Sequence, residues 1–405
     1  MTRRSLINVL FHSGVLWGVL FTVGFVEFTS GSAVLAFGCA GLGALGVWSA
    51  RRRIAVTGST WFDRHDDYLM RLAHVLLIVF AVRVGATMAR ELVTSDTVSP
   101  HGTWWVLGTT LFVVGITWLA DRFFSAVLAL ASVVVAAVIG WVSWSVLVHG
   151  GFRGNHLATV TGSGASLAMT FRGIAVAAVS FTVIDSVMVR WRQRHAEDVD
   201  IFRPTLIAVT GAAMVLAYVM VTAAGPISSH IPYVFPVIAQ TYSGETASRA
   251  AEGVAVVLMM SSAAVMLRGL LASVSSSLRR QGVLAIVALG ALVTYPVMDL
   301  LQAAATLIVV SWLVVTSRRL LRVSEAREPW YEWIPPTCGA TVAALGLYGV
   351  LEQHLSLDQR SGAHHLIQLL VLLTLVVAFG AVYTRHQRRR QGPRPIPFSD
   401  QREIE

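Results

Sequence analysis

The chain has 405 residues, of which 55% are hydrophobic and only 13% are charged, against about 25% charged residues in a soluble domain. This composition excludes an ordinary soluble protein and indicates a polytopic, all-α membrane protein. All 31 basic residues are arginine, which excludes Schiff-base chemistry on lysine.

Apolar runs of about 20 residues are long enough to cross a bilayer, and the breaks between them define about twelve predicted transmembrane helices. The first run lacks a convincing cleavage site for a signal peptide. A short helix is also expected at 234–242, where it could lie across the outer mouth. In chain order the twelve helices span residues 7–28, 31–49, 69–94, 103–120, 123–148, 167–190, 204–225, 250–277, 283–296, 298–316, 333–352 and 363–384.

The arginines mark one side of these helices. With the N-terminus in the cytoplasm, the opposite loops carry only Arg153, Arg249 and Arg360, with Arg90 near an outer helix end. This distribution follows the positive-inside rule, so both termini are predicted to be cytoplasmic, in a plasma-membrane protein. The net charge of +9 is then a topology signal, and no nucleic-acid partner is expected. The arginines at the even-numbered helix ends, which this topology makes cytoplasmic, are residues 51–53, 122, 190, 192, 194, 279, 280, 318, 319, 322, 385 and 388–390.

Three motifs resemble those of amino acid–polyamine–organocation permeases. SFTVIDSV (180–187) is similar to the family's sixth helix, in which F-[ST]-G-[FY]-[DE] is typical. LASVSSSLRRQGVL (271–284) is similar to the end of its eighth helix, and DLLQAAATLIVVSWLVVTSRRLLR (299–322) to its tenth. The chain therefore resembles a divergent member of this superfamily over roughly residues 100–322.

The resemblance implies five helices, an inverted copy of those five and two further helices, with a substrate site midway across the membrane. The expected domains are a ten-helix core over 1–322, two additional helices over 323–385 and a cytoplasmic tail over 386–405, whose polar, proline-rich composition indicates disorder.

The implied function is secondary active transport of amino acids or related organic amines and cations by alternating access. The expected partners are a small-molecule substrate and membrane lipids, without enzyme activity, cofactor or metal. Coupling to protons is expected rather than to sodium, although the usual lysine of helix five is absent. The two cysteines, Cys39 and Cys338, lie in predicted spans and favour neither a disulfide framework nor a metal site.

Two departures from the family pattern keep an alternative open. Val183 stands where the sixth helix usually has glycine, and the first helix lacks its G-x-G. A β-branched residue is less able to adopt the geometry of an unwound segment. The alternative is a permease-like scaffold or accessory subunit that has lost transport.

Charged residues within spans are costly and usually mark a functional site or a buried pair. Arg268 lies 11 residues before Arg279, about 16 Å along a helix, which is too deep for the basic helix end alone. We expect it to face the bundle interior, with Asp185 as its partner by depth. A substrate anchor or gate and a structural ion pair are equally compatible with this placement.

The resemblance adds Phe181, as an apolar or cation–π wall, and Thr182, as a hydroxyl, to the predicted substrate site. Arg83, near the middle of the third helix, could offer charge to an anionic substrate or to a gate. The predicted site is therefore Phe181, Thr182, Asp185, Arg268 and Arg83.

A third function, an integral membrane enzyme acting on lipid-linked substrates, would need an acidic or metal site at a membrane face. Only Asp63, His65, Asp66 and Asp67 offer one. These residues lie at the start of a cytoplasmic helix, where acidic side chains favour the helix dipole and its N-cap. Capping is the preferred interpretation, and alanine at Asp66 or Asp67 is expected to leave function intact.

Overall fold

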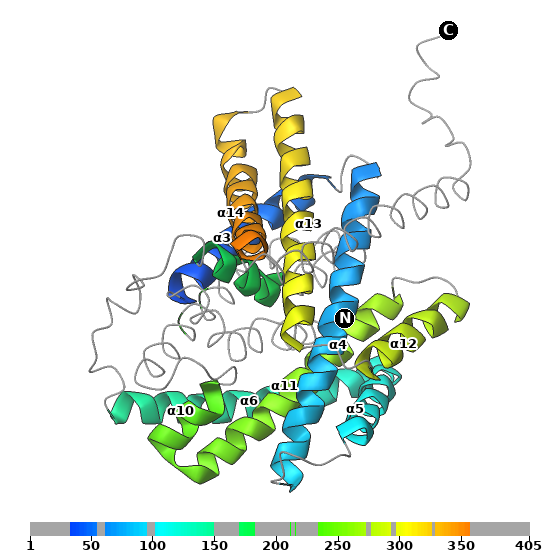
Figure 1. Ribbon diagram of the computed structural model, residues 1–405, viewed down its shortest axis with the longest axis vertical. Coiled ribbons are helices and arrows are strands. Elements are labelled where there is room, and N and C mark those ends of the chain that lie inside the picture. The colour runs from blue at the N-terminus through cyan, green and yellow to red at the C-terminus, as the bar shows by residue number, and fades with distance from the viewer. Residues whose placement is uncertain are drawn as a thin grey trace.

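A computed structural model describes residues 33–54, 61–94, 102–149, 170–182, 234–272, 277–292, 297–325 and 329–356, together with positions 211 and 215. Figure 1 shows these segments as a bundle of crossing helices, and no strand occurs among them. The predicted helices at 7–28 and 363–384, and the tail, lie outside the described residues, and so does the predicted helix at 204–225 apart from positions 211 and 215.

The elements follow one another along the chain as α3 (Ala33–Ile54), α4 (Trp61–Thr94), α5 (Gly102–Thr117), α6 (Asp121–Val148), the helix Thr170–Thr182, α10 (Val234–Ser243), α11 (Glu245–Ala272), α12 (Ser277–Leu292), α13 (Val297–Glu325), the 3₁₀ turn η2 (Trp330–Glu332) and α14 (Ile334–Ser356). Six of these described segments are long and apolar enough to cross a membrane, namely the ones in α3, α4, α6, α11, α13 and α14. The short helix expected at 234–242 is confirmed as α10.

Several helices extend beyond the predicted apolar windows. Helix α4 begins at Trp61 rather than near residue 69, and α13 continues to Glu325 rather than ending near residue 316. The added turns are rich in Asp, Arg and Glu. An apolar window predicts only the part of a helix that a bilayer covers. Arginine and glutamate are good helix formers in water, so a helix can continue beyond that window.

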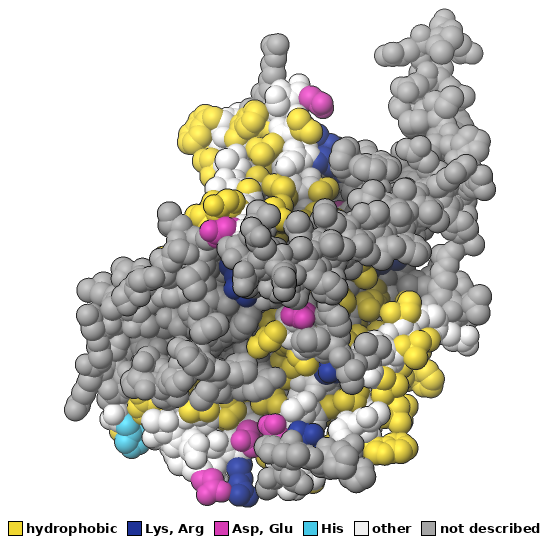
Figure 2. All heavy atoms as spheres, in the orientation of Figure 1, with side chains coloured by type: hydrophobic (Ala, Val, Ile, Leu, Met, Phe, Trp, Pro, Cys, Tyr) yellow, Lys and Arg dark blue, Asp and Glu magenta, His cyan; other side chains and the backbone are white. Residues whose placement is uncertain are grey.

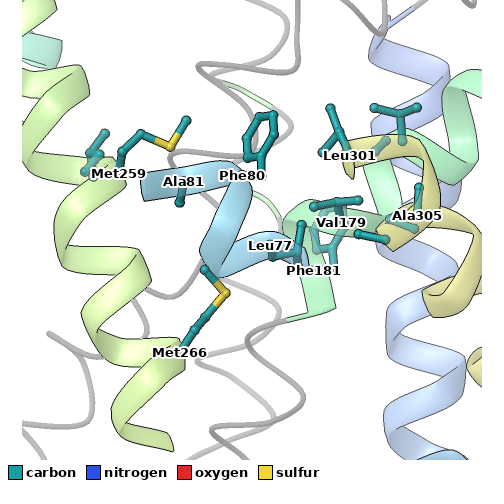
Figure 3. Close-up of a cluster of buried hydrophobic side chains, with 14 of the residues drawn as sticks. Leu77, Phe80, Ala81, Val179, Phe181, Met259, Met266, Leu301 and Ala305 are labelled. Carbon is teal, nitrogen blue, oxygen red and sulfur yellow. The ribbon is translucent and has the colours of Figure 1, made fainter. Parts of the chain in front are cut away.

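The centre of the molecule lies where α4 meets α11 and α13. Helix α4 packs extensively against both partners, and Figure 1 shows it as a long helix that crosses α11. The helix Thr170–Thr182 enters the same core, because its residues from Gly173 onward are all buried. Segments far apart in the sequence therefore meet at one central cluster (Figure 3).

Small residues bring α3, α14 and the helix Thr170–Thr182 close together. A Cβ atom built on Gly46 of α3 would lie 2.4 Å from the carbonyl oxygen of Pro335 in α14. A Cβ atom on Gly349 would lie 2.2 Å from the backbone nitrogen of Arg172. Such backbone-to-backbone contact is how small residues hold membrane helices together without a hydrophobic driving force.

A sharp corner joins α10 to α11 at Gly244. Its φ of 86° lies in the left-handed region that glycine adopts without strain. The Gly244 backbone N–H donates to the carbonyl of Gln240 at 3.0 Å and closes the last turn of α10. This corner directs α11 into the core.

Candidate functional site

Phe181 and Thr182, two of the predicted substrate residues, lie in the central cluster. Phe181 is 1% exposed, and Figure 3 shows it together with Val179 in the cluster that includes Leu77 of α4 and Leu301 of α13. Thr182 is fully buried, and its hydroxyl donates to the carbonyl of Ala178 at 3.0 Å. The structure thus brings these two residues to the middle of the bundle.

Ser180 is the residue of this helix that sequence reasoning missed. Its side chain is fully buried, and its Oγ finds no hydrogen-bond partner in the part of the chain that the structure describes. A buried hydroxyl without a partner costs about 1 to 3 kcal/mol. The signal was available in the SFT tripeptide (180–182), where two adjacent polar residues flank Phe181 within an apolar helix.

Arg268 pairs with Asp121, the first residue of α6. Its guanidinium carbon also lies 4.3 Å from the centre of the Phe124 ring, in cation–π geometry. The sequence predicted Asp185 as its partner, and Asp185 lies outside the described residues. The pairing with Asp121 is a result of helix packing. Helix α11 contacts α6, and this contact places Arg268 beside the first residue of α6.

The Arg268–Asp121 pair is half open to solvent. The Arg268 side chain is 26% exposed and that of Asp121 is 92% exposed. Arg268 Nη1 is buried and makes no hydrogen bond to any residue the structure describes. The arrangement can therefore hold α11 against α6 near one end of the bundle while leaving a donor available.

We expect a small coupling between Arg268 and Asp121 in a double-mutant cycle. Exposed ion pairs contribute about 0 to 1 kcal/mol, so Arg268→Ala, Asp121→Ala and the double variant should differ from additivity by less than about 1 kcal/mol. Thermal unfolding of the four purified proteins in detergent measures the coupling.

The same cycle with Asp185→Ala distinguishes the two possible partners. Removing one member of a buried pair costs about 3 to 5 kcal/mol. A coupling of that size between Arg268 and Asp185 would contradict the assignment of Asp121 as the principal partner.

A second ionic cluster joins α3, α4 and α13. Arg51 Nη2 donates to Asp66 Oδ1 at 2.7 Å and to Ser311 Oγ at 3.0 Å, and the Ser311 hydroxyl also donates to Asp66. The Arg51 and Asp66 side chains are 12% and 15% exposed, and Ser311 is fully buried. We call these three residues the Arg51 cluster.

The Arg51 cluster changes the interpretation of Asp66. The sequence predicted it as a residue of a helix N-terminus, yet it lies five residues inside α4 and links two other helices. Arg51 was interpreted only as a topology signal. Ser311, a hydroxyl between apolar residues, was a sequence signal of a polar contact inside α13.

The remaining predicted residue, Arg83, is half-buried near the middle of α4. Among the described residues, no group of three His, Cys, Asp or Glu side chains is arranged to hold a metal ion. The side chains of Asp63, His65 and Asp67 lie outside the description.

Comparison with known proteins assigns neither a family nor a function to the chain. The chain matches no protein-family model and no curated protein. The relationship to amino acid–polyamine–organocation permeases therefore stays a prediction from the motifs of the sixth, eighth and tenth helices.

Proposed function

We propose that this protein is a secondary active transporter of amino acids or related organic amines, working by alternating access across the plasma membrane. The observation that carries the proposal is the buried Ser180 hydroxyl, which has no hydrogen-bond partner among the described residues and lies beside Phe181 and Thr182 in the central cluster. Polar groups without partners are rare in native interiors and call for an explanation. A polar substrate group that reaches this position supplies the missing hydrogen bond.

The helix arrangement supports the proposal. In the numbering that the resemblance implies, α4 is the third helix and α11 the eighth, which are equivalent members of two inverted repeats. These two helices pack together along much of their length, and the next equivalent pair, α5 and α12, is also in contact. A two-fold axis between the repeats would pass between α4 and α11.

The ionic contacts supply elements that could separate and re-form. Arg268 joins α11 to α6, and the Arg51 cluster joins α3, α4 and α13. In the predicted topology both contacts lie toward the cytoplasmic ends of their helices. We propose that they hold the cytoplasmic side closed, and that coupling is to protons.

Uptake into proteoliposomes tests the proposal. Purified protein with an imposed proton gradient should accumulate at least one member of a panel of amino acids and amines with saturable kinetics. The absence of gradient-dependent uptake for every member, with correctly folded protein, would overturn it.

Ser180→Ala has an expected result that a structural role would not produce. The substitution removes a buried hydroxyl that has no partner among the residues the structure describes. The melting temperature should therefore stay the same or rise by a few degrees, while the substrate KM rises about tenfold. Ser261→Ala is the matched control, because the Ser261 hydroxyl already donates to the carbonyl of Leu258 at 3.2 Å. Unchanged KM in Ser180→Ala would remove Ser180 from the site.

The alternative is a permease-like scaffold without transport. The dense apolar packing of Phe181 at 1% exposure favours it, as does Val183 in place of glycine. If the protein is a scaffold, Ser180→Ala should be more stable than the wild type, with no change in any substrate-dependent measurement. None of the amino acids and amines in the panel should then shift the melting temperature of the wild-type protein.

A further inference from the structure

An apolar groove of about 380 Å³ lies between α4, α5 and α11. Figure 2 shows hydrophobic side chains gathered on this side of the molecule, over α5 and α12. Aromatic rings form much of its wall, and Trp104 and Phe112 are 70% and 54% exposed. The lining residues are Ala89, Trp104, Trp105, Gly108, Thr109, Phe112 and Met260.

Gly108 keeps the groove open. A Cβ atom built on Gly108 would meet no atom of another described residue within 4 Å. A side chain would therefore fit at this position, and its absence leaves the groove open. Glycine in a helix costs about 1 kcal/mol relative to alanine. Helix packing does not require glycine at this position, in contrast to Gly46, where a backbone atom would clash.

One end of the groove carries a positive charge. Arg90 follows the lining residue Ala89, and its Nη1 lies 3.7 Å from a Cβ atom built on Gly102, at the start of α5. Trp104 and Trp105 lie in the same first turn of α5. The groove therefore runs from an arginine and two tryptophans toward Phe112 and Met260, deeper in the apolar part of the helices.

We propose that this groove binds an anionic phospholipid, with one acyl chain along α5 and its phosphate on Arg90. An apolar lining fits a hydrocarbon chain, which gains dispersion contacts with fixed aromatic walls. Arginine matches phosphate through paired N–H donors, and tryptophan is enriched at the level of the lipid headgroups. The site goes beyond the transport proposal and needs only that these helices lie in a bilayer.

The placement of the lipid follows from the direction of α4. In the predicted topology the Arg90 end of α4 is the outer end, so the site lies in the outer leaflet. Met260 of α11 forms part of the groove wall, so the bound chain contacts all three helices. A lipid held there would join α5 to the α4–α11 pair.

Native mass spectrometry of the detergent-purified full chain measures the first lipid bound, with phosphatidylglycerol and phosphatidylcholine as probes. Gly108→Leu fills the groove, and we expect its affinity for both lipids to fall about tenfold. Arg90→Gln removes the charge, and we expect it to weaken phosphatidylglycerol about tenfold and to leave phosphatidylcholine unchanged.

The chain offers matched controls for both variants. Gly115→Leu adds the same side chain to α5 at a position that is also open but outside the groove. Arg249→Gln removes another arginine, one whose side chain is 69% exposed and pairs with Glu245. Both controls should bind each lipid within about twofold of the wild type.

Wild-type affinity in Gly108→Leu would overturn the proposal, and so would equal loss of both lipids in Arg90→Gln. If Gly108→Leu does not fold, Gly108→Ala adds one methyl group and should give a smaller loss for both lipids; no loss there also overturns the site. Because the measurement is lipid binding, its failure leaves the transport proposal untouched, and failure of uptake leaves the lipid site untouched.

Discussion

Asp66→Ala is expected to lower the free energy of unfolding by about 3 to 5 kcal/mol, because it leaves the Arg51 guanidinium buried without its carboxylate. Arg51 and Asp66 meet at 2.7 Å and are 12% and 15% exposed. Ser311 loses its acceptor in the same variant, so all three helices of the cluster are affected. Thermal unfolding in detergent, with folded yield from size-exclusion chromatography, measures the loss.

The double variant separates an ion pair from two independent contributions. Arg51→Ala together with Asp66→Ala removes both charges of the pair, so it should be more stable than the sum of the single losses predicts, by about 1 to 3 kcal/mol. Additive losses would show that the two side chains act through other partners.

The chain contains an ion pair of the same length that serves as a control. Arg249 and Glu245 also meet at 2.7 Å, but their side chains are 69% and 73% exposed. Glu245→Ala should therefore cost less than about 1 kcal/mol. A comparable loss in Glu245→Ala and Asp66→Ala would contradict the view that burial, rather than distance, decides the effect.

Gly46→Ala is expected to destabilise the protein by about 3 kcal/mol, since the new methyl group meets backbone atoms that cannot rotate away. Its Cβ would lie 2.4 Å from the Pro335 carbonyl oxygen and 2.8 Å from the backbone nitrogen of Gly339. Helices α3 and α14 must then move apart along their contact. The melting temperature in detergent reports the change.

Gly115→Ala makes the same chemical change where no atom lies within 4 Å of the new Cβ. Alanine is favoured over glycine in a helix by about 1 kcal/mol, so this variant should be as stable as the wild type or slightly more stable. Equal destabilisation of the two variants would show that α3 and α14 do not make the close contact.

Sequence and structure agree best where the evidence was local. Hydropathy and helix-breaking residues were sufficient to predict three helices. These are α6, α11 and the short helix at 234–242. The polar ends of α4 and α13 were not predicted. Hydropathy detects segments that contact lipid, and it does not detect helical turns that extend into water.

The candidate site could be predicted only in part. The SFT motif placed Phe181 and Thr182 on one helix, and the structure places that helix in the core. The partner of Arg268 could not be predicted, because depth along a helix leaves rotation about its axis and the choice of neighbour undetermined. The structure pairs it with Asp121, 147 residues away in the sequence.

The sequence by itself predicted a helical protein with membrane-spanning segments, because 55% of its residues are hydrophobic and many lie in runs of bilayer length. It also marked Arg268 as unusual. Only the tertiary structure decided which polar side chains meet. The Arg51 cluster joins residues 51, 66 and 311. Within the described part of the chain, Ser180 has no hydrogen-bond partner, and Gly108 borders open space whereas Gly46 touches backbone. These differences depend on which helix faces lie together, and side-chain packing between distant segments sets that choice.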